Sequence, residues 1–514
     1  MDIVLINPPV TKPGEPPAGL AKLVGALKHH GRPCLAIDAN MEGLMSLLDG
    51  AEASGDTWTR RAVSHLGEDL ASLRNGDAFR NMGSYTRAVT DIDRILSLRG
   101  KQHGTHVSLN NFLQGALSPV RSTDLVRSAE NPEASVFYPY FERRLRTLLE
   151  EHAPRLVGFS LNYLSQALTT FAMIGFIRRM SPRVKIILGG GLVTSWMRGP
   201  GWSAPFEGLV DELVAGPGEE RLLSLAGGEH AARPSLPDYG PFWGYGYLSP
   251  GRVVPFSTSW GCYWGRCSFC PEKAEGNAFS CLSPETVTGA LAALREENSP
   301  GLVHLCDNAL SPALLRSLAA QEAGDPWYGF ARFTGHLADP DFCSALARSG
   351  CVMLKLGLES GDQKVLDALG KGIRLEEAAR VLACLHKAGI ATYVYLLFGT
   401  PAEDEASARK TLEFIATHHR LVDFLNTSIF NLPRGSAEAR ELDTYDFSQG
   451  DLSLYQGFAH PKGWDRNRVR QFLDKEFKRS PAISRIIRRD PPVFTSNHAP
   501  FFMLKASGAR RQDP

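Results

Sequence analysis

Hydrophobic and polar positions along the first half of the chain alternate between short apolar runs and amphipathic stretches, which predicts strands and helices in turn. The predicted strands lie at 2–6, 33–38, 156–161, 184–188 and 212–215. Helical spacing covers 20–29 and 167–180. The first strand, helix and second strand follow one another at βαβ spacing, so we expect parallel pairing with right-handed crossovers. The pattern predicts a doubly wound, Rossmann-like α/β domain over residues 1–228.

A polar, helix-prone stretch interrupts this alternation between residues 42 and 152. Its apolar residues, such as Phe141, Leu145 and Leu148, have the spacing of amphipathic helices. We therefore expect a helical insertion after the second strand. The stretch 229–251 is rich in glycine, proline and aromatic residues and is predicted to be a linker.

A second alternating series occupies residues 252–442. Its apolar runs lie at 254–257, 303–306, 327–332, 353–358, 393–398 and 424–430. Helical patterns cover 284–297, 312–320, 339–349, 375–388 and 405–418. Six parallel strands with outer helices predict a partial (β/α)6 barrel of the TIM type, which binds ligands at the carboxyl ends of its strands. Residues 443–514 are expected to form an irregular, partly helical C-terminal cap or tail.

Composition restricts the class of protein further. The 514 residues suffice for two to four domains, and 56 Lys and Arg against 55 Asp and Glu leave a net charge of +1. No global charge therefore attracts nucleic acid, and no apolar run is long enough to span a bilayer. We expect a cytoplasmic protein without a membrane span or a nucleic-acid partner. Its nine cysteines are expected to be reduced, metal-bound or buried.

The tail carries a basic segment with interleaved apolar residues between Lys462 and Arg489. We expect it to dock on the barrel with its charged face in water. The alternative is a basic amphipathic helix that contacts nucleic acid, a membrane or an acidic peptide. His498, which follows this segment, is expected to be a structural histidine.

The sharpest chemical signal is the run Trp260-Gly-Cys-Tyr-Trp-Gly-Arg-Cys-Ser-Phe-Cys270, directly after the first strand of the second series. Cys262, Cys267 and Cys270 supply three thiolates, which can hold three irons of a four-iron cluster and leave the fourth iron open. A zinc knuckle, which normally needs a fourth Cys or His, and chance clustering are the alternatives. The other cysteines fit buried positions, with Cys306 at the end of the next strand as a further candidate.

This loop and the strand ends that follow it resemble the radical S-adenosylmethionine (SAM) family. The cysteine spacing is C-x4-C-x2-C, one residue longer than the usual C-x3-C-x2-C. The strand ends that resemble SAM-contacting positions of the family are Asp307-Asn308, Arg332, Gly357 to Gly361 and Gly399-Thr400-Pro401.

The resemblance implies a role for each SAM-site residue. Arg332 is the cation expected for the SAM carboxylate, and Glu359 and Ser360 are expected to accept hydrogen bonds from the ribose. Adenine is expected to stack against an apolar wall and to bond to the backbone near Phe269, and Gly399 allows close approach of the barrel backbone. Asp307 is the remaining SAM-binding candidate.

The strand ends of the first domain resemble a cobalamin-binding domain that precedes many radical SAM domains. The candidate residues are Asn7, Pro8, Pro9, Ser160, Asn162, Gly189, Gly190, Gly191, Gly216, Gly218 and Glu219. The D-x-H-x-x-G motif that supplies an axial histidine is absent, as are G-x-G-x-x-G and Walker loops. The alternative is a domain that has lost the corrinoid.

Taken together, the resemblance implies a cobalamin-dependent radical SAM enzyme that methylates an unactivated carbon of a small molecule or peptide. Its cofactors would be a 4Fe-4S cluster, SAM and cobalamin, with an electron donor such as flavodoxin or ferredoxin. One alternative is radical chemistry without methyl transfer: ring formation, ring contraction or oxygen insertion. A methylthiotransferase would usually carry a second cysteine-bound cluster, and the sequence has no second three-cysteine group. A non-catalytic iron-sulfur or cobalamin sensor is the alternative outside enzymes.

Overall fold

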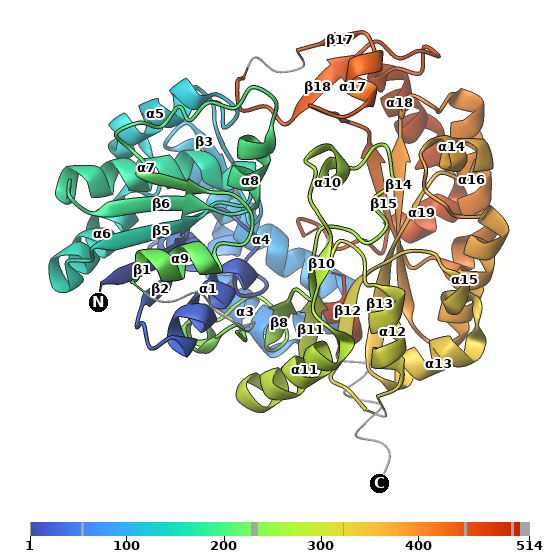
Figure 1. The fold of residues 1–514 in the computed structure, drawn as a ribbon, viewed down its shortest axis with the longest axis horizontal. Helices are drawn as coiled ribbons and strands as arrows, with labels where there is room; N and C mark the ends of the chain where they lie inside the picture. Colours follow the sequence, from blue (N-terminus) through green and yellow to red (C-terminus); the bar gives the residue numbers. More distant parts are fainter. Residues whose placement is uncertain are drawn as a thin grey trace. The chain divides into compact units, whose positions relative to one another are not determined.

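The computed structural model describes residues 2–52, 56–227, 235–321, 323–446, 450–494 and 498–503. These form two compact units (Figure 1). The first unit comprises the described part of 1–254 together with 450–454 and 492–494, and the second comprises 255–446, 455–491 and 498–503.

The first unit is built on a five-stranded parallel sheet. Its strands are β1 (Ile3–Asn7), β2 (Leu35–Asp38), β5 (Leu156–Ser160), β6 (Lys185–Gly189) and β7 (Glu212–Val214), in the order β2-β1-β5-β6-β7. Every residue of β1 and β5 is buried, as expected for strands covered on both faces. The strand order reverses between β1 and β5, where open α/β sheets bind their ligands. The predicted doubly wound fold is confirmed.

Helices cover both faces of this sheet. Helix α1 (Ala18–His29) contacts α9 (Glu219–Leu225), and α7 (Leu164–Met180) contacts α5 (Ser122–Glu130) and α6 (Tyr138–His152). Residues 166–177 of α7 are all buried because α5 and α6 cover the side that would otherwise face water. A Cβ atom at Gly175 would lie 1.8 Å from the Ala129 carbonyl oxygen, so α5 and α7 approach closely only because this residue is glycine.

The stretch between β2 and β5 is mainly helical, as the sequence predicts. It contains α2 (Ala39–Leu48), α3 (Thr57–Asn75), α4 (Met82–Lys101), α5 and α6. It also contains an antiparallel hairpin of β3 (Thr105–Val107) and β4 (Phe112–Gln114) that the sequence analysis did not predict. Strands of three residues are too short to display an alternating pattern.

The second unit contains the expected partial barrel. Its parallel strands follow chain order: β8 (Val253–Phe256), β11 (Leu302–Leu305), β12 (Trp327–Ala331), β13 (Cys351–Glu359), β14 (Ala391–Phe398) and β15 (Phe424–Ile429). The helices between them include α11 (Pro284–Asn298), α12 (Pro312–Ala319), α13 (Pro340–Arg348), α14 (Gln363–Ala368), α15 (Leu375–Lys387) and α16 (Glu405–His418). Ser283, Ser311 and Asp404 accept the first free backbone N–H groups of α11, α12 and α16, which fixes where these helices begin.

The C-terminal segment packs on the second unit. A small antiparallel sheet of β16 (Leu432–Pro433), β18 (Tyr455–Phe458) and β17 (Thr444–Tyr445) is followed by α18 (Arg466–Phe472), a π-helical turn at Leu473–Phe477 and α19 (Pro481–Ile487). Helix α19 contacts α16 and β15, and Phe472 and Phe477 pack on Phe398. The apolar side of the basic segment is therefore covered by the barrel, as expected for a docked element.

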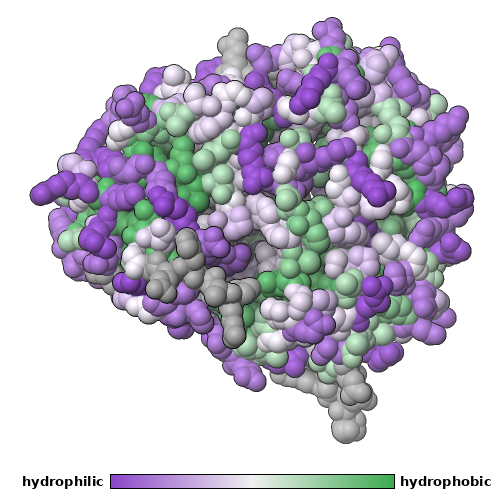
Figure 2. Space-filling model, viewed as in Figure 1, coloured by the Kyte–Doolittle hydropathy of each residue, from purple (hydrophilic) through white to green (hydrophobic). Residues whose placement is uncertain are grey.

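The surface carries mostly hydrophilic side chains on the face shown in Figure 2, with smaller apolar patches between them. Across the described ranges, no helix is long and apolar enough to cross a bilayer.

Candidate functional site

Asp307 anchors the start of the cysteine loop. Its carboxylate accepts hydrogen bonds from Thr258 N (3.2 Å), Thr258 Oγ1 (2.7 Å) and the Ser259 hydroxyl. Burial raises the pKa of Asp307, and these hydrogen bonds oppose the shift. The side chain predicted to contact SAM therefore bonds to the two residues that lead into the loop.

The three loop thiols gather at the carboxyl end of β8. Cys267 is buried, and Cys262 and Cys270 are half-buried. Burial raises the pKa of the Cys270 thiol, and the nearby Cys267 and Cys262 raise it further, against hydrogen bonds from backbone N–H groups. A thiolate at Cys270 is therefore unfavourable in the free protein. A bound cluster of positively charged iron would stabilise the thiolates and offset this cost of deprotonation.

The donor chemistry of the loop fits a four-iron cluster. In the parts of the chain that the structure describes, no three His, Cys, Asp or Glu side chains form a site for a metal ion. A four-iron cluster takes one thiolate at each iron, so its ligands need not converge on one point. The three neighbouring thiols can therefore bind three irons.

Trp264 holds the expanded loop against the segment that follows α14. Its indole Nε1 donates to the Gly370 carbonyl oxygen at 3.0 Å. The Arg332 Cζ atom lies 4.2 Å from the centroid of the Trp264 ring, and the Arg266 Cζ atom lies 5.0 Å from it. Gly372 has φ +64° and its Cβ position is 2.2 Å from the indole, so only glycine leaves room for the ring.

Arg332 lies directly after β12, against the cysteine loop. Its side chain donates to the Cys267 sulfur at 3.8 Å and to the Lys371 carbonyl oxygen. Only 7% of the residue is exposed, so the guanidinium is held with little access to water. The structure brings this predicted residue together with the thiols.

Glu359 and Lys371 form a buried ion pair beside the loop. The Lys371 ammonium lies 2.7 Å from Glu359 Oε1 and 5.5 Å from the centroid of the Phe269 ring. Glu359 ends β13 with φ +68°, which turns the chain at this position. Lys371 was missed by the sequence analysis. Its flanking glycines, Gly370 and Gly372, were the available signal, but they do not indicate which carboxylate the lysine meets.

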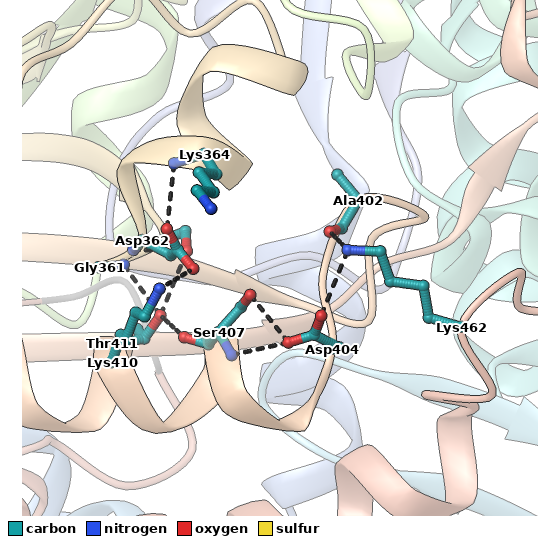
Figure 3. A network of polar contacts seen from close by, with 10 residues as sticks. Gly361, Asp362, Lys364, Ala402, Asp404, Ser407, Lys410, Thr411 and Lys462 are labelled. Atoms are coloured by element: carbon teal, nitrogen blue, oxygen red, sulfur yellow. Dashed lines mark hydrogen bonds and ion pairs between the residues drawn. The ribbon is translucent and has the colours of Figure 1, made fainter.

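Ser360 faces helix α16. Its fully buried Oγ accepts from Asp362 N at 3.1 Å and lies 3.3 Å from Thr411 Oγ1. Figure 3 shows Thr411 and Lys410 of α16 directed toward Gly361 and Asp362, with the Lys410 ammonium 2.9 Å from the Asp362 carboxylate. The structure therefore does not bring the Ser360 hydroxyl to the Glu359–Lys371 pair.

Glu403 supports the turn after β14. Gly399, with φ +77°, donates its N–H to Glu403 Oε2, and Trp464 Nε1 donates to the same oxygen at 3.0 Å. Burial raises the pKa of Glu403 to about 7, although these two hydrogen bonds oppose the shift. His460 Nε2 lies 2.9 Å from the Thr400 carbonyl oxygen, so the C-terminal segment holds both sides of the turn.

Replacement of this carboxyl by an amide is expected to change how stability depends on pH. The folded pKa of Glu403 is about 7 and the unfolded value is about 4.3, so the wild type loses stability as pH rises through this window. Glu403→Gln cannot ionise. We expect its unfolding free energy relative to wild type to rise by about 3 kcal/mol from about pH 5 to about pH 8, measured by urea denaturation. A difference that is constant with pH would contradict the assignment.

Asn7 and the two prolines after it are held by α7 at the switch point. Asn7 Nδ2 donates to Asp38 Oδ1 at 2.9 Å, and Gln166 Nε2 donates to Asn7 Oδ1 at 3.2 Å and to the Pro8 carbonyl at 2.7 Å. Thr169 donates to the Pro9 carbonyl oxygen. The Asn7 amide is therefore engaged by the chain on both of its ends.

The predicted residues after β5 and β6 lie together. Asn162 Nδ2 donates to Ser160 Oγ at 3.0 Å, and Gly191 N donates to Asn162 Oδ1 at 2.9 Å. Gly190, next to Gly189, has φ +111°, and its Cβ position is 2.4 Å from the Leu161 carbonyl oxygen. A side chain has no room there, so the glycine lets the turn after β6 pack closely against the residue that follows β5.

The residues after β7 lie beside α1. Gly216, with φ +78°, donates its N–H to Thr194 Oγ1 at 2.9 Å. The Glu219 carboxylate lies 2.5 Å from the Lys22 ammonium, and the Cβ position of Gly218 is 3.6 Å from Leu23 Cδ2. Glu219 therefore joins α9 to α1 and carries a paired charge.

Residues 235–251 belong to the expected linker, and hydrogen bonds attach them to the first unit. Tyr247 donates to Asp38 Oδ2 at 2.7 Å, and Tyr245 donates to Glu42 at 3.1 Å. Burial raises the pKa of Asp38, and its hydrogen bonds oppose the shift. These tyrosines were not singled out from the sequence, because nothing local links them to an aspartate about 200 residues earlier.

Residues 257–415 match the family model "Radical SAM superfamily". A bacteriochlorophyllide d C-12(1)-methyltransferase of Chlorobaculum tepidum is 27% identical over 210 residues, 38% of this chain and 46% of that protein. The chain thus spans about half the length of this curated relative.

Two solved structures share the fold. The radical SAM methyltransferase TsrM from Kitasatospora setae, with tryptophan substrate and a SAM analogue bound, matches 94% of this chain and 89% of its own, with a TM-score of 0.56 and 16% identity. The cobalamin-dependent SAM radical enzyme OxsB, with aqua-cobalamin bound, matches 92% of this chain and 67% of its own, with a TM-score of 0.57 and 13% identity.

Proposed function

The chain carries a radical SAM domain, and from this premise we propose that it is a cobalamin-dependent methyltransferase that acts on an unactivated carbon. The observation that carries the proposal is the gathering of Cys262, Cys267 and Cys270 on one loop of that domain, beside Arg332 and Lys371. The substrate is a small molecule or a peptide, and the electron comes from a flavodoxin or ferredoxin.

Each candidate site residue of the second unit has a role in this proposal. The three thiolates hold the cluster, and Arg332 and Lys371 place positive charge where the SAM carboxylate binds. Glu359 accepts from the ribose hydroxyls, while Phe269 and Gly399 border the adenine. Asp307 and Ser360 hold the strand ends, since their oxygens bond to the chain.

The first unit supplies the corrinoid site. At the carboxyl edge of its sheet Gly191 is exposed, so a flat ligand can lie against its backbone, and the Asn7-Pro8-Pro9 turn borders the same edge. When bound, a reduced cluster supplies the electron that cleaves SAM, and methylated cobalamin supplies the methyl group. Radical chemistry without methyl transfer is the second candidate, because the radical SAM domain by itself could carry it.

The test is anaerobic reconstitution of the full chain with iron, sulfide and hydroxocobalamin, followed by metal analysis and reaction with SAM and dithionite. About four irons and about one cobalt per chain, with release of 5'-deoxyadenosine, would support the proposal. Iron without cobalt would favour the second candidate. A protein that binds neither metal would overturn both.

A further inference from the structure

Arg332 contacts the cysteine loop at a sulfur atom. We propose that Arg332 raises the reduction potential of the bound cluster through its hydrogen bond to Cys267 Sγ, and that Trp264 is the residue that positions it. This inference rests on the proposed function, because it requires that the loop hold a four-iron cluster. It adds an electronic role to the SAM-binding role given to Arg332 above.

The guanidinium is fixed from three directions. One nitrogen lies 3.8 Å from Cys267 Sγ, another donates to the Lys371 carbonyl, and the planar group lies over the Trp264 ring at 4.2 Å. Arginine stays protonated in proteins, so its charge is permanent. Since the residue is buried, water and salt screen this charge weakly.

The direction of the effect follows from the charge of the couple. The oxidised cluster gains one electron, supplied by flavodoxin, ferredoxin or dithionite, and the reduced cluster is more negative by one unit. A hydrogen bond to a ligand sulfur and a nearby fixed cation both stabilise the more negative state. Arg332 therefore makes reduction easier.

Trp264 explains how the arginine is held. The stretch between Cys262 and Cys267 contains Trp264, which fits against Gly372 and bonds to Gly370. One face of the indole is thereby available to Arg332, whose donor then reaches Cys267.

The test is a potentiometric titration of the reconstituted full chain without SAM, with the reduced cluster followed by electron paramagnetic resonance. We expect Arg332→Gln to shift the midpoint potential to a more negative value. Arg332→Lys keeps the charge and should shift it less. Arg266→Gln is the matched control, because Arg266 also lies on Trp264 but is exposed, so that water screens its charge, and the cluster of this variant should titrate at the wild-type potential.

Trp264→Leu provides a second route if Arg332→Gln fails to retain the cluster. It keeps the arginine and removes the ring that positions it, so we expect a shift in the same direction. Wild-type potentials in Arg332→Gln, or in Trp264→Leu when the first variant is lost, would overturn the inference. A wild-type chain that binds no iron would instead overturn the proposed function.

Discussion

Alanine at Cys262, Cys267 or Cys270 is expected to abolish cluster binding while the chain still folds. Each thiolate is expected to hold a different iron, so the loss of one thiol leaves one iron without its protein ligand. The loop itself is secured by Asp307 at its base and by Trp264, so loss of one thiol leaves its supports in place. Iron and sulfide per chain after anaerobic reconstitution are the measurements.

Cys281→Ala is the matched control. Cys281 lies on the neighbouring β10 (Ser280–Cys281), is exposed and is outside the loop, so this variant should keep the wild-type iron content. Unchanged iron in any of the three loop variants would remove that cysteine from the ligand set. A colourless wild-type protein that retains zinc in air would favour the zinc knuckle.

Lys371→Met is expected to lower the free energy of unfolding by about 3–5 kcal/mol, because it leaves the buried Glu359 carboxylate without its partner. The Lys371 and Glu359 side chains are 8% and 11% exposed. Urea denaturation of the unligated protein measures this loss without interference from a cofactor. The variant should also bind SAM more weakly, since a buried cation beside the loop is gone.

An exposed pair of similar length provides the control for this prediction. The Lys478 ammonium lies 2.8 Å from Asp474, and the two side chains are 44% and 66% exposed. Lys478→Met should cost much less stability than Lys371→Met, since water replaces the lost contact. Adding Glu359→Met to Lys371→Met should recover part of the loss by removing the unpaired charge. Equal losses for Lys371→Met and Lys478→Met would contradict the assigned burial of the pair.

The pattern of the chain predicted the two parallel sheets because each strand is a local apolar run that must be covered on both faces. The strands β1, β5 and β13 were identified in this way. The hairpin β3–β4 and the sheet β16-β18-β17 were missed, since strands of two to four residues carry almost no periodic signal.

The residues of the candidate site also differ in how far the sequence could identify them. Cys262, Cys267 and Cys270 could be identified from the sequence because their spacing within nine residues is itself the signal. Arg332 could be placed near them because parallel strands end at one edge. The partners of Asn7 and Asp307 could not be anticipated, since the hydrogen bonds of these side chains go to other strands and helices.

Local order along the chain thus determines the strands, the helices and the cysteine loop, because apolar periodicity and ligand spacing are properties of neighbouring residues. The tertiary structure determines which charged and aromatic side chains contact each other. Trp264 bonds to a carbonyl 106 residues away, and Arg332 reaches a sulfur 65 residues away. Contacts of this kind depend on the packing of whole strands and helices, and no short stretch of sequence encodes them.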